Sequence, residues 1–362
     1  MKTLKLGQVT NMLHFKYYTK QEIKQLTRSR YGECKIGDKI ACIKSADEVE
    51  SFLQQSPAKF VLFGIPEDIG VRANYGRPGA NTAWKPAVEN VLNLQDNSFF
   101  SAENLIVLGE VDVDDLMEQA ANSSSKNKFD IERLRKLVEF IDARVVEVVE
   151  MIIAANKIPI VIGGGHNNSY PIIKAVNEAL RREKKTCTKG INAINCDAHT
   201  DFRALEGRHS GNSFSYAFEE GILNKYAVLA LHEQYNAVNI LQKFKDNPEF
   251  LLYTTYEDIF IREKETFMQS IDACINFCKE CYCGVELDLD SITNVPSSAR
   301  TSCGISPLQA RQYVYRCAQK LNPAYLHIAE GAPVLSHIKA DYKTGKLISY
   351  LVSDFIKGFT EK

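Results

Sequence analysis

Six residues in three short runs of this 362-residue chain are of the types that bind metal ions. They are His166 in GGGHNNS, Asp197, His199 and Asp201 in CDAHTD, and Asp288 and Asp290 in ELDLD. Four carboxylates and two imidazoles carry more negative charge than one divalent cation needs, and they match a pair of cations that share bridging carboxylates. Oxygen-rich ligation with some imidazole suits Mn²⁺. The runs therefore predict a hydrolase in which two cations lower the pKa of a shared water and so provide a hydroxide nucleophile.

The spacing within each run favours convergence of the side chains. Asp197, His199 and Asp201 alternate, so an extended backbone directs all three to one side, and the same holds for Asp288 and Asp290. The glycines of GGGHNNS permit a tight turn before the histidine. Taken alone, each acidic run could be a solvated turn, and a lone histidine is more often a hydrogen-bonded structural residue. The combination of the runs is what indicates a metal site.

The elements that position these runs are strands alternating with helices from about residue 58 onward. The predicted strands are Phe60–Gly64, Leu105–Leu108, Pro159–Ile162, Ile191–Cys196, Ala227–Leu231, Leu251–Thr254, Tyr282–Leu289 and Tyr325–Ala329. The predicted helices are Ile131–Asn156, Tyr170–Glu183, Tyr235–Lys245, Thr266–Lys279 and Pro307–Leu321. Nearly continuous apolar strands indicate an α/β fold with a mostly parallel sheet covered by helices on both faces. We expect a single domain over residues 1–362, with residues 1–55 as an N-terminal extension packed on it.

The candidate ligands fall where predicted strands end. His166 follows one strand, Asp197 follows another, and Asp288 ends a third. Glu330, in HIAEGAP, follows a fourth. In open α/β sheets, ligands bind at the edge formed by the carboxyl ends of the strands. An isolated glutamate is usually a surface residue, but at the mouth of a metal site Glu330 could hold a cationic amidine or guanidine through two parallel hydrogen bonds.

Composition excludes several other classes of function. The formal net charge is −1 and no basic run occurs, so we expect no nucleic-acid partner. No stretch of 18 apolar residues occurs and the N-terminus lacks the apolar core of a signal peptide, so we expect a cytoplasmic protein without a membrane span. No Ser/His/Asp set or GxSxG run is recognisable, so a serine nucleophile is not expected.

Four of the ten cysteines crowd together at Cys274, Cys278, Cys281 and Cys283. They could form a zinc clip, but no paired CxxC knuckles follow and the spacing fits structural zinc sites poorly. Free cysteine is among the most often buried residue types. We therefore favour reduced thiols in a buried helix and strand.

The three runs, in this order, resemble those of the ureohydrolase family, which includes arginase, agmatinase and formimidoylglutamase. The resemblance covers roughly residues 58–335 and implies a three-layer αβα arginase-like fold with an about eight-stranded sheet. It also implies two Mn²⁺ per subunit, although other divalent transition metals would fit, and a homo-oligomer. By the family pattern, Asp197 and Asp288 bridge the cations, Asp201 also carries a proton to the leaving group, and Glu330 holds the amidinium or guanidinium of a small-molecule substrate.

Three features are similar to those of formimidoylglutamases rather than arginases. They are GVRANYGRPGA at residues 70–80, Arg203 where arginases usually have asparagine, and Phe214 where arginases have histidine. Candidate substrate-binding residues are therefore Arg203, Asn212 and Glu330, with Arg72 and Arg77 as further candidates. The favoured reaction is hydrolysis of N-formimidoyl-L-glutamate to L-glutamate and formamide.

The chain also departs from the family pattern. Glu286 precedes the DxD run, where the family usually has serine or threonine, and Thr293-Asn294 replaces an Asp-Pro pair. These changes affect the pocket wall, so other ureohydrolase substrates such as arginine or agmatine remain alternatives. A non-catalytic metal-binding scaffold and a zinc deacetylase of related architecture are the rival classes.

Overall fold

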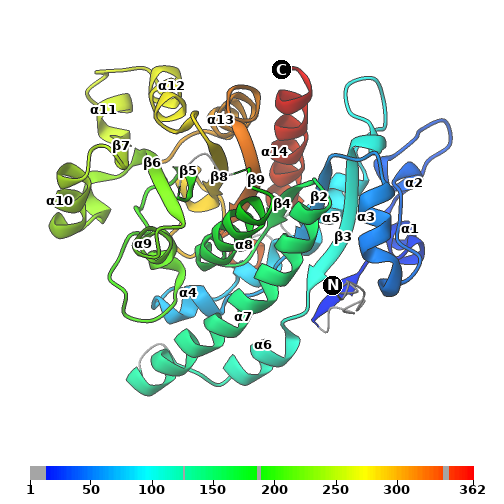
Figure 1. The fold of residues 1–362 in the computed structure, drawn as a ribbon, viewed down its shortest axis with the longest axis horizontal. Helices are drawn as coiled ribbons and strands as arrows, with labels where there is room; N and C mark the ends of the chain where they lie inside the picture. Colours follow the sequence, from blue (N-terminus) through cyan, green and yellow to red (C-terminus); the bar gives the residue numbers. More distant parts are fainter. Residues whose placement is uncertain (1–13, 125–126, 186–188, 337–341) are drawn as a thin grey trace, which may run out of the picture.

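A nine-stranded β-sheet crosses the computed structural model, which describes residues 14–124, 127–185, 189–336 and 342–362 (Figure 1). The strands are β1 (Phe15–Tyr17), β2 (Phe60–Gly64), β3 (Leu105–Val111), β4 (Ile158–Ile162), β5 (Ile191–Cys196), β6 (Leu223–Leu231), β7 (Leu251–Thr255), β8 (Tyr282–Asp288) and β9 (Asn322–Ala329). Their order across the sheet is β1-β3-β2-β4-β9-β8-β5-β6-β7. The neighbours pair in parallel except for β1, which is antiparallel to β3.

Helices cover both faces of this sheet (Figure 1). They are α1 (Lys20–Leu26), α2 (Ile36–Lys39), α3 (Val49–Gln55), α4 (Ile69–Ala73), α5 (Trp84–Leu92), α6 (Asp114–Ala120), α7 (Lys128–Ala154), α8 (Ser169–Arg182), α9 (Ser213–Glu219), α10 (Val238–Asp246), α11 (Tyr256–Phe260), α12 (Phe267–Cys278), α13 (Pro307–Lys320) and α14 (Tyr342–Thr360). One apolar core joins the sheet to α5, α12, α13 and α14, and the other joins it to α7, α8 and α9. Within the described part of the chain, none of these helices is both long enough and apolar enough to span a membrane.

Successive residues of the central strands enter opposite cores. On β2, Phe60 and Leu62 pack in the core that includes α13 and α14 (the α13/α14 core). Val61 and Phe63 pack in the core that includes α7 and α8 (the α7/α8 core). Because side chains alternate between the two faces of a strand, both sets must be apolar when both faces are covered. This burial explains the continuous apolar runs of the sequence, and it confirms the predicted three-layer αβα fold.

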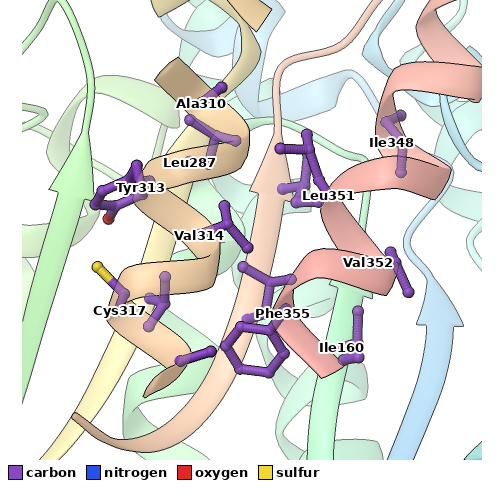
Figure 2. Packing of buried hydrophobic residues seen from close by; sticks show 14 of the residues in the cluster. Ile160, Leu287, Ala310, Tyr313, Val314, Cys317, Ile348, Leu351, Val352 and Phe355 are labelled. Atoms are coloured by element: carbon purple, nitrogen blue, oxygen red, sulfur yellow. The ribbon is translucent and has the colours of Figure 1, made fainter. Parts of the chain in front are cut away.

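The predicted strands all correspond to strands of the sheet, and the predicted helices correspond to α7, α8, α10, α12 and α13. β1 has no predicted counterpart because three residues are too few to show an alternation pattern, so the sheet has nine strands rather than about eight. α14 also has none, although Leu351, Val352 and Phe355 recur at helical spacing. Figure 2 shows Leu351 and Phe355 pointing towards α13, where Val314 lies.

The N-terminal region described from residue 14 onward packs on the rest of the molecule. β1 adds to the edge of the sheet by pairing Phe15 with Val111, and Ile23 of α1 and Ile36 of α2 are buried in the α13/α14 core. Residues 1–13 lie outside the described residues.

Four neighbouring strands at the centre of the sheet, β4, β9, β8 and β5, precede the candidate site residues. Since these strands are parallel, their carboxyl ends lie at one edge of the sheet. The loops that leave them are therefore adjacent in space although they are more than 160 residues apart in sequence, as His166 and Glu330 are.

Candidate metal centre and substrate cavity

The six candidate ligands come together in two groups at this edge. The first ligand group is His166, Asp197, Asp201 and Asp288, and the second is Asp197, His199 and Asp290. In each group, one ligand atom from every residue lies within 4.8 Å of the others. Asp197 belongs to both groups, so its two carboxylate oxygens can bridge two neighbouring cations.

The distances between ligand atoms suit coordination of a cation. Nδ1 of His166 lies 2.9 Å from Oδ2 of Asp201 and 3.3 Å from Oδ2 of both Asp197 and Asp288. In the second group, Nδ1 of His199 lies 3.3 Å from Oδ1 of Asp197, and it also lies 3.4 Å from a carboxylate oxygen of Asp290. Two atoms at right angles around a cation, each about 2.1 to 2.3 Å from it, are roughly 3.0 to 3.3 Å apart. Both groups therefore have the spacing of ligands around one ion.

Several of these atoms are buried without a hydrogen bond. Nδ1 of His166 and Oδ1 of Asp290 have no hydrogen-bond partner among the described residues. Such atoms are rare in folded proteins because an unsatisfied buried polar group is unfavourable. A pair of divalent cations would satisfy them, so the residues present fit the group that the sequence predicts.

Electrostatics lead to the same conclusion. Burial and the neighbouring charge of Asp197 raise the pKa of Asp201 to about 6, and burial together with the charges of Asp290 and Asp197 raises the pKa of Asp288 well above its usual value. Burial opposes protonation of His166, but the surrounding carboxylates outweigh it and raise its pKa. The centre thus attracts protons when it holds no cation. Divalent cations would replace those protons, and cation binding would release them.

The loops achieve this convergence through local turns. Oδ1 of Asp197 accepts the backbone N–H of His199, and Oδ1 of Asp288 accepts that of Asp290, both at 2.7 Å. Each leading aspartate therefore shapes its own loop as well as facing the centre. Before His166, Gly163 and Gly164 adopt φ values of 87° and 72°, which residues other than glycine rarely adopt.

Glu67 holds the histidine loop from a distant part of the chain. Its buried carboxylate accepts the backbone N–H groups of Gly70 and Gly165 and the side-chain amide of Asn168. Burial raises the pKa of this carboxyl group despite those donors. Glu67 was not among the candidate residues, because an acidic residue after a strand carries no signal that its partners Gly165 and Asn168 lie about 100 residues away.

Glu330 lies beside the first ligand group. Its Oε1 accepts the backbone N–H of His166 at 2.9 Å, and its own N–H donates to the carbonyl of Gly164. Burial raises the pKa of Glu330 to about 8. Glu330 and Asp201 also share an uncommon backbone conformation, with φ of 64° and 45°. Non-glycine residues in this region cluster at functional sites.

A cavity of about 520 Å³ opens onto the two ligand groups. Its lining includes Asn74, His199, Asp201, Arg203, Tyr235, Asn236, Asp288, Asp290 and Glu330. Arg203 has a half-exposed side chain whose guanidinium lies 4.0 Å from Glu206. The ring centroid of Tyr235 is 5.8 Å from that of His199, so this residue forms a wall next to a candidate ligand. Asn74, within the GVRANYGRPGA run, and Tyr235, which no sequence motif indicates, are further lining residues that were not among the candidates.

Asn212 and the two further candidate arginines have other partners. The buried amide of Asn212 donates to the carbonyls of Ala204 and Gly207 and accepts from Arg208, so it shapes a loop and does not line the cavity. The Arg72 guanidinium donates to backbone carbonyls after α6, and that of Arg77 donates to the carbonyls of residues 297 and 298. Of these predicted substrate-binding residues, the structure places Arg203 and Glu330 in the cavity.

Phe214 is buried beneath the centre and does not line the cavity. Its ring lies edge-on to that of His166, with centroids 5.4 Å apart, and stacks on Tyr226 at 4.2 Å. At this position, where the chain differs from arginases, the side chain therefore packs against the ring of the candidate ligand His166.

The cysteine cluster is part of the apolar core. Cys274, Cys278, Cys281 and Cys283 are buried, and burial raises the pKa of the Cys274 and Cys278 thiols well above the usual value. Among the described residues, none of the groups with the spacing of metal ligands contains a cysteine. This arrangement matches buried thiols and does not match a zinc clip.

A mostly parallel α/β sheet with two ligand groups sharing a carboxylate at its carboxyl edge defines a binuclear metal-dependent hydrolase by class. The chain belongs to the arginase family, whose model matches residues 58–356. Membership of the ureohydrolases, expected from the three runs, is thereby confirmed.

Individual relatives are similar over most of their length. The formimidoylglutamase of Streptococcus gordonii is 26% identical over 258 residues, which cover 68% of this chain and 69% of the relative. The structure of the formimidoylglutamase from Bacillus subtilis has a TM-score of 0.71 at 19% identity and covers 92% of this chain and 95% of that one. A Trypanosoma cruzi formiminoglutamase with Mn²⁺ has a TM-score of 0.68 at 18% identity, covering 91% and 100%. At these identities the structural likeness shows the fold.

Proposed function

We propose that this protein hydrolyses the C–N bond of a linear amidine, with N-formimidoyl-L-glutamate as the favoured substrate. The observation that carries the proposal is that members of both ligand groups line one cavity together with Glu330 and Arg203. The names of the relatives, which are formimidoylglutamases, support this substrate. Mn²⁺ is the favoured cation because of the donor set and because the Trypanosoma cruzi relative contains it.

In this reaction, water adds its oxygen to the formimidoyl carbon and the bond from that carbon to the glutamate nitrogen breaks. Two divalent cations in the centre would activate the water and neutralise the developing negative charge. The residues of the chain bind the substrate and move the proton.

Glu330 binds the cationic end of the substrate. Its carboxylate is fixed by the His166 N–H, and an ionised carboxylate can accept two parallel hydrogen bonds from an amidinium. Arg203 supplies a positive charge on the same cavity wall for a carboxylate of the glutamate end. With these two residues, the substrate would lie between an anion and a cation.

Asp201 delivers the proton to the departing amine. Its carboxyl group lines the cavity, and a carboxyl group held within hydrogen-bond reach of the departing amine can transfer a proton to it. Asp201→Asn is therefore expected to leave the fold intact and to reduce turnover by about 10²- to 10⁴-fold. Unchanged turnover in the purified variant would contradict this role.

The experiment that tests the function is incubation of the Mn²⁺-loaded chain with formimidoylglutamate, arginine and agmatine. We expect glutamate and formamide in equal amounts from the first compound and no urea from the others. Urea production would assign the chain to another ureohydrolase activity. Turnover of none of the three by protein that holds two cations would support a non-catalytic scaffold. The expected homo-oligomeric state stays a prediction, which light scattering of the purified chain would test.

A further inference from the structure

Glu286 is a buried carboxylate directly behind the candidate metal centre, at a position where the ureohydrolase family usually has serine or threonine. It lies in β8, two residues before Asp288. The Tyr325 hydroxyl donates to Oε1 at 2.6 Å, the Ser169 hydroxyl donates to Oε2 at 3.0 Å, and Nδ1 of His327 lies 2.8 Å from Oε2. The carboxylate thus has a complete set of partners built for it.

Glu286 also faces the far side of a candidate ligand. Its Oε2 lies 3.4 Å from Nε2 of His166, whereas Nδ1 of the same ring faces the carboxylates of the first ligand group. Nε2 has no hydrogen-bond partner among the described residues. A histidine that binds a cation through Nδ1 carries its ring proton on Nε2, and the negative charge of the Glu286 carboxylate beside Nε2 favours that tautomer and ring orientation.

His327 is matched to Glu286 by the register of the sheet. The two residues are direct partners across the β8–β9 pair, and both are fully buried. The His327 ring also lies edge-on to the His166 ring, with centroids 5.8 Å apart. A buried carboxylate needs a partner of opposite charge or several hydrogen-bond donors. The ring of His327, on the neighbouring strand, provides such a donor when its Nδ1 carries the proton.

We propose that Glu286 and His327 are positioning residues that hold His166 with Nδ1 towards the first ligand group and thereby set the cation affinity of that group. The inference rests on the binuclear centre of the proposed function, but not on the identity of the substrate. Among the described residues, no hydrogen bond or ion pair of Glu286 reaches the second ligand group, in which His199 provides the imidazole. The pair therefore acts on one of the two cation sites.

The test is a Mn²⁺ titration of the cation-free full chain and of Glu286→Gln, which keeps the size of the side chain and removes its charge. Equilibrium dialysis with Mn²⁺ counting gives the two affinities, and electron paramagnetic resonance distinguishes single ions from coupled pairs. We expect one of the two sites to weaken by about 10- to 100-fold and the other to change by less than about threefold. The coupled-pair signal should then appear only at higher Mn²⁺ concentration.

His327→Gln is the second variant, and it decides the matter if Glu286→Gln does not fold. It should weaken the same site, and the double variant should lose no more affinity than the larger single loss, because residues that act as one unit are not additive.

Tyr313→Phe is the matched control. The Tyr313 hydroxyl donates to the carbonyls of Glu286 in β8 and Ile194 in β5, so its removal costs buried hydrogen bonding to these strands without altering the group that faces His166. We expect a lower melting temperature and unchanged affinity at both sites.

Three results would overturn the inference. Glu286→Gln could bind both cations with wild-type affinity, or it could lose both alike in step with stability, as a purely structural residue would. If the wild-type chain itself binds fewer than two Mn²⁺, the binuclear centre of the proposed function fails, and this inference fails with it.

Discussion

Two regions of the chain concentrate residues of metal-binding type, and the structure treats them differently. At the carboxyl edge of the sheet, imidazole and carboxylate atoms from separate loops converge to 2.9–3.4 Å around His166 and His199. On the α12 side of the sheet, the thiols of Cys274 and Cys278 are buried among apolar side chains. Judged by spacing in the sequence, the cysteines would be the better candidates for a metal site. Judged by the distances between ligand atoms, the carboxyl edge of the sheet is the better candidate.

The difference lies in whether the side chains can be satisfied without an ion. A neutral thiol packs as a small apolar group, and burial holds its pKa high. Buried carboxylates that face one another cannot be satisfied in this way, because each disfavours the charge of the next. A group of buried carboxylates whose charges are not neutralised by the protein therefore indicates a metal site better than the mere presence of residue types that can bind metals.

The largest effect is expected at Asp197, the residue common to both ligand groups. Asp197→Asn should reduce the Mn²⁺ retained after dialysis from two per chain to one or none, with a loss larger than the about 10- to 100-fold typical of residues outside the coordination shell. Mass spectrometry of the dialysed protein measures it. Asp272→Asn, which removes a carboxylate paired with Arg316 on the surface, is the control that should retain two. Two cations retained by Asp197→Asn would remove the contrast between the regions.

The next effect concerns Glu330 and the substrate cation. Glu330→Gln should lower kcat/KM by roughly 30-fold or more, because loss of one member of a buried charge pair costs about 2 kcal/mol or more. Steady-state kinetics with formimidoylglutamate measure it, and the Mn²⁺ content should stay at two. Loss of Mn²⁺ instead would mean that Glu330 acts on the centre rather than on the substrate.

The raised pKa of Glu330 predicts that the affinity of the cavity for an amidinium ion depends on pH. Below its pKa of about 8, the protonated group loses its attraction for an amidinium, so affinity for acetamidinium should fall by up to about tenfold per pH unit. Divalent cations favour the ionised form, so Mn²⁺ should shift the onset of this loss to lower pH. Calorimetry between pH 6 and 9, with and without Mn²⁺, measures both effects. A pH profile that Glu330→Gln leaves unchanged would assign the titration to another group.

A smaller effect is expected at Arg203, because its side chain is half-exposed. Arg203→Gln should raise KM for formimidoylglutamate by about fivefold, since an exposed ion pair is worth roughly 1 kcal/mol. Binding of acetamidinium, which lacks a carboxylate, should be unchanged. If both ligands weaken equally, Arg203 does not recognise the carboxylate.

The smallest functional effect is expected in the thiol region. Cys278→Ala should lower the free energy of unfolding by about 1 kcal/mol, the usual size of a modest core change, and should leave Mn²⁺ content and turnover as they are. Urea unfolding and metal analysis measure the two. A loss of bound metal in Cys278→Ala would restore the zinc interpretation.

The sequence predicted the strands and the convergence of the candidate ligands because both carry local signals. Continuous apolar runs mark buried parallel strands, and polar residues at their ends mark the edge where ligands bind. The supports of the centre carry no such signal. Glu67 and Glu286 depend on partners that the fold brings from 39 to 117 residues away, and their register is fixed only by the assembled sheet.

Asn212 illustrates the opposite limit. Its position in the loop after the CDAHTD run suggested contact with the substrate, but the amide is used to close its own loop. A motif indicates which residues lie near a site. It does not indicate whether their polar atoms are already bonded.

The left-handed backbone at Asp201 and Glu330 sets stability against activity in this chain. Glycine at either position would relieve roughly 1 kcal/mol or more of strain and delete a carboxylate that has a role in the proposed reaction. A screen that selects for heat resistance alone should therefore enrich inactive proteins at these two positions. Thermostable forms of this enzyme are better sought in the helical layers than at the edge of the sheet.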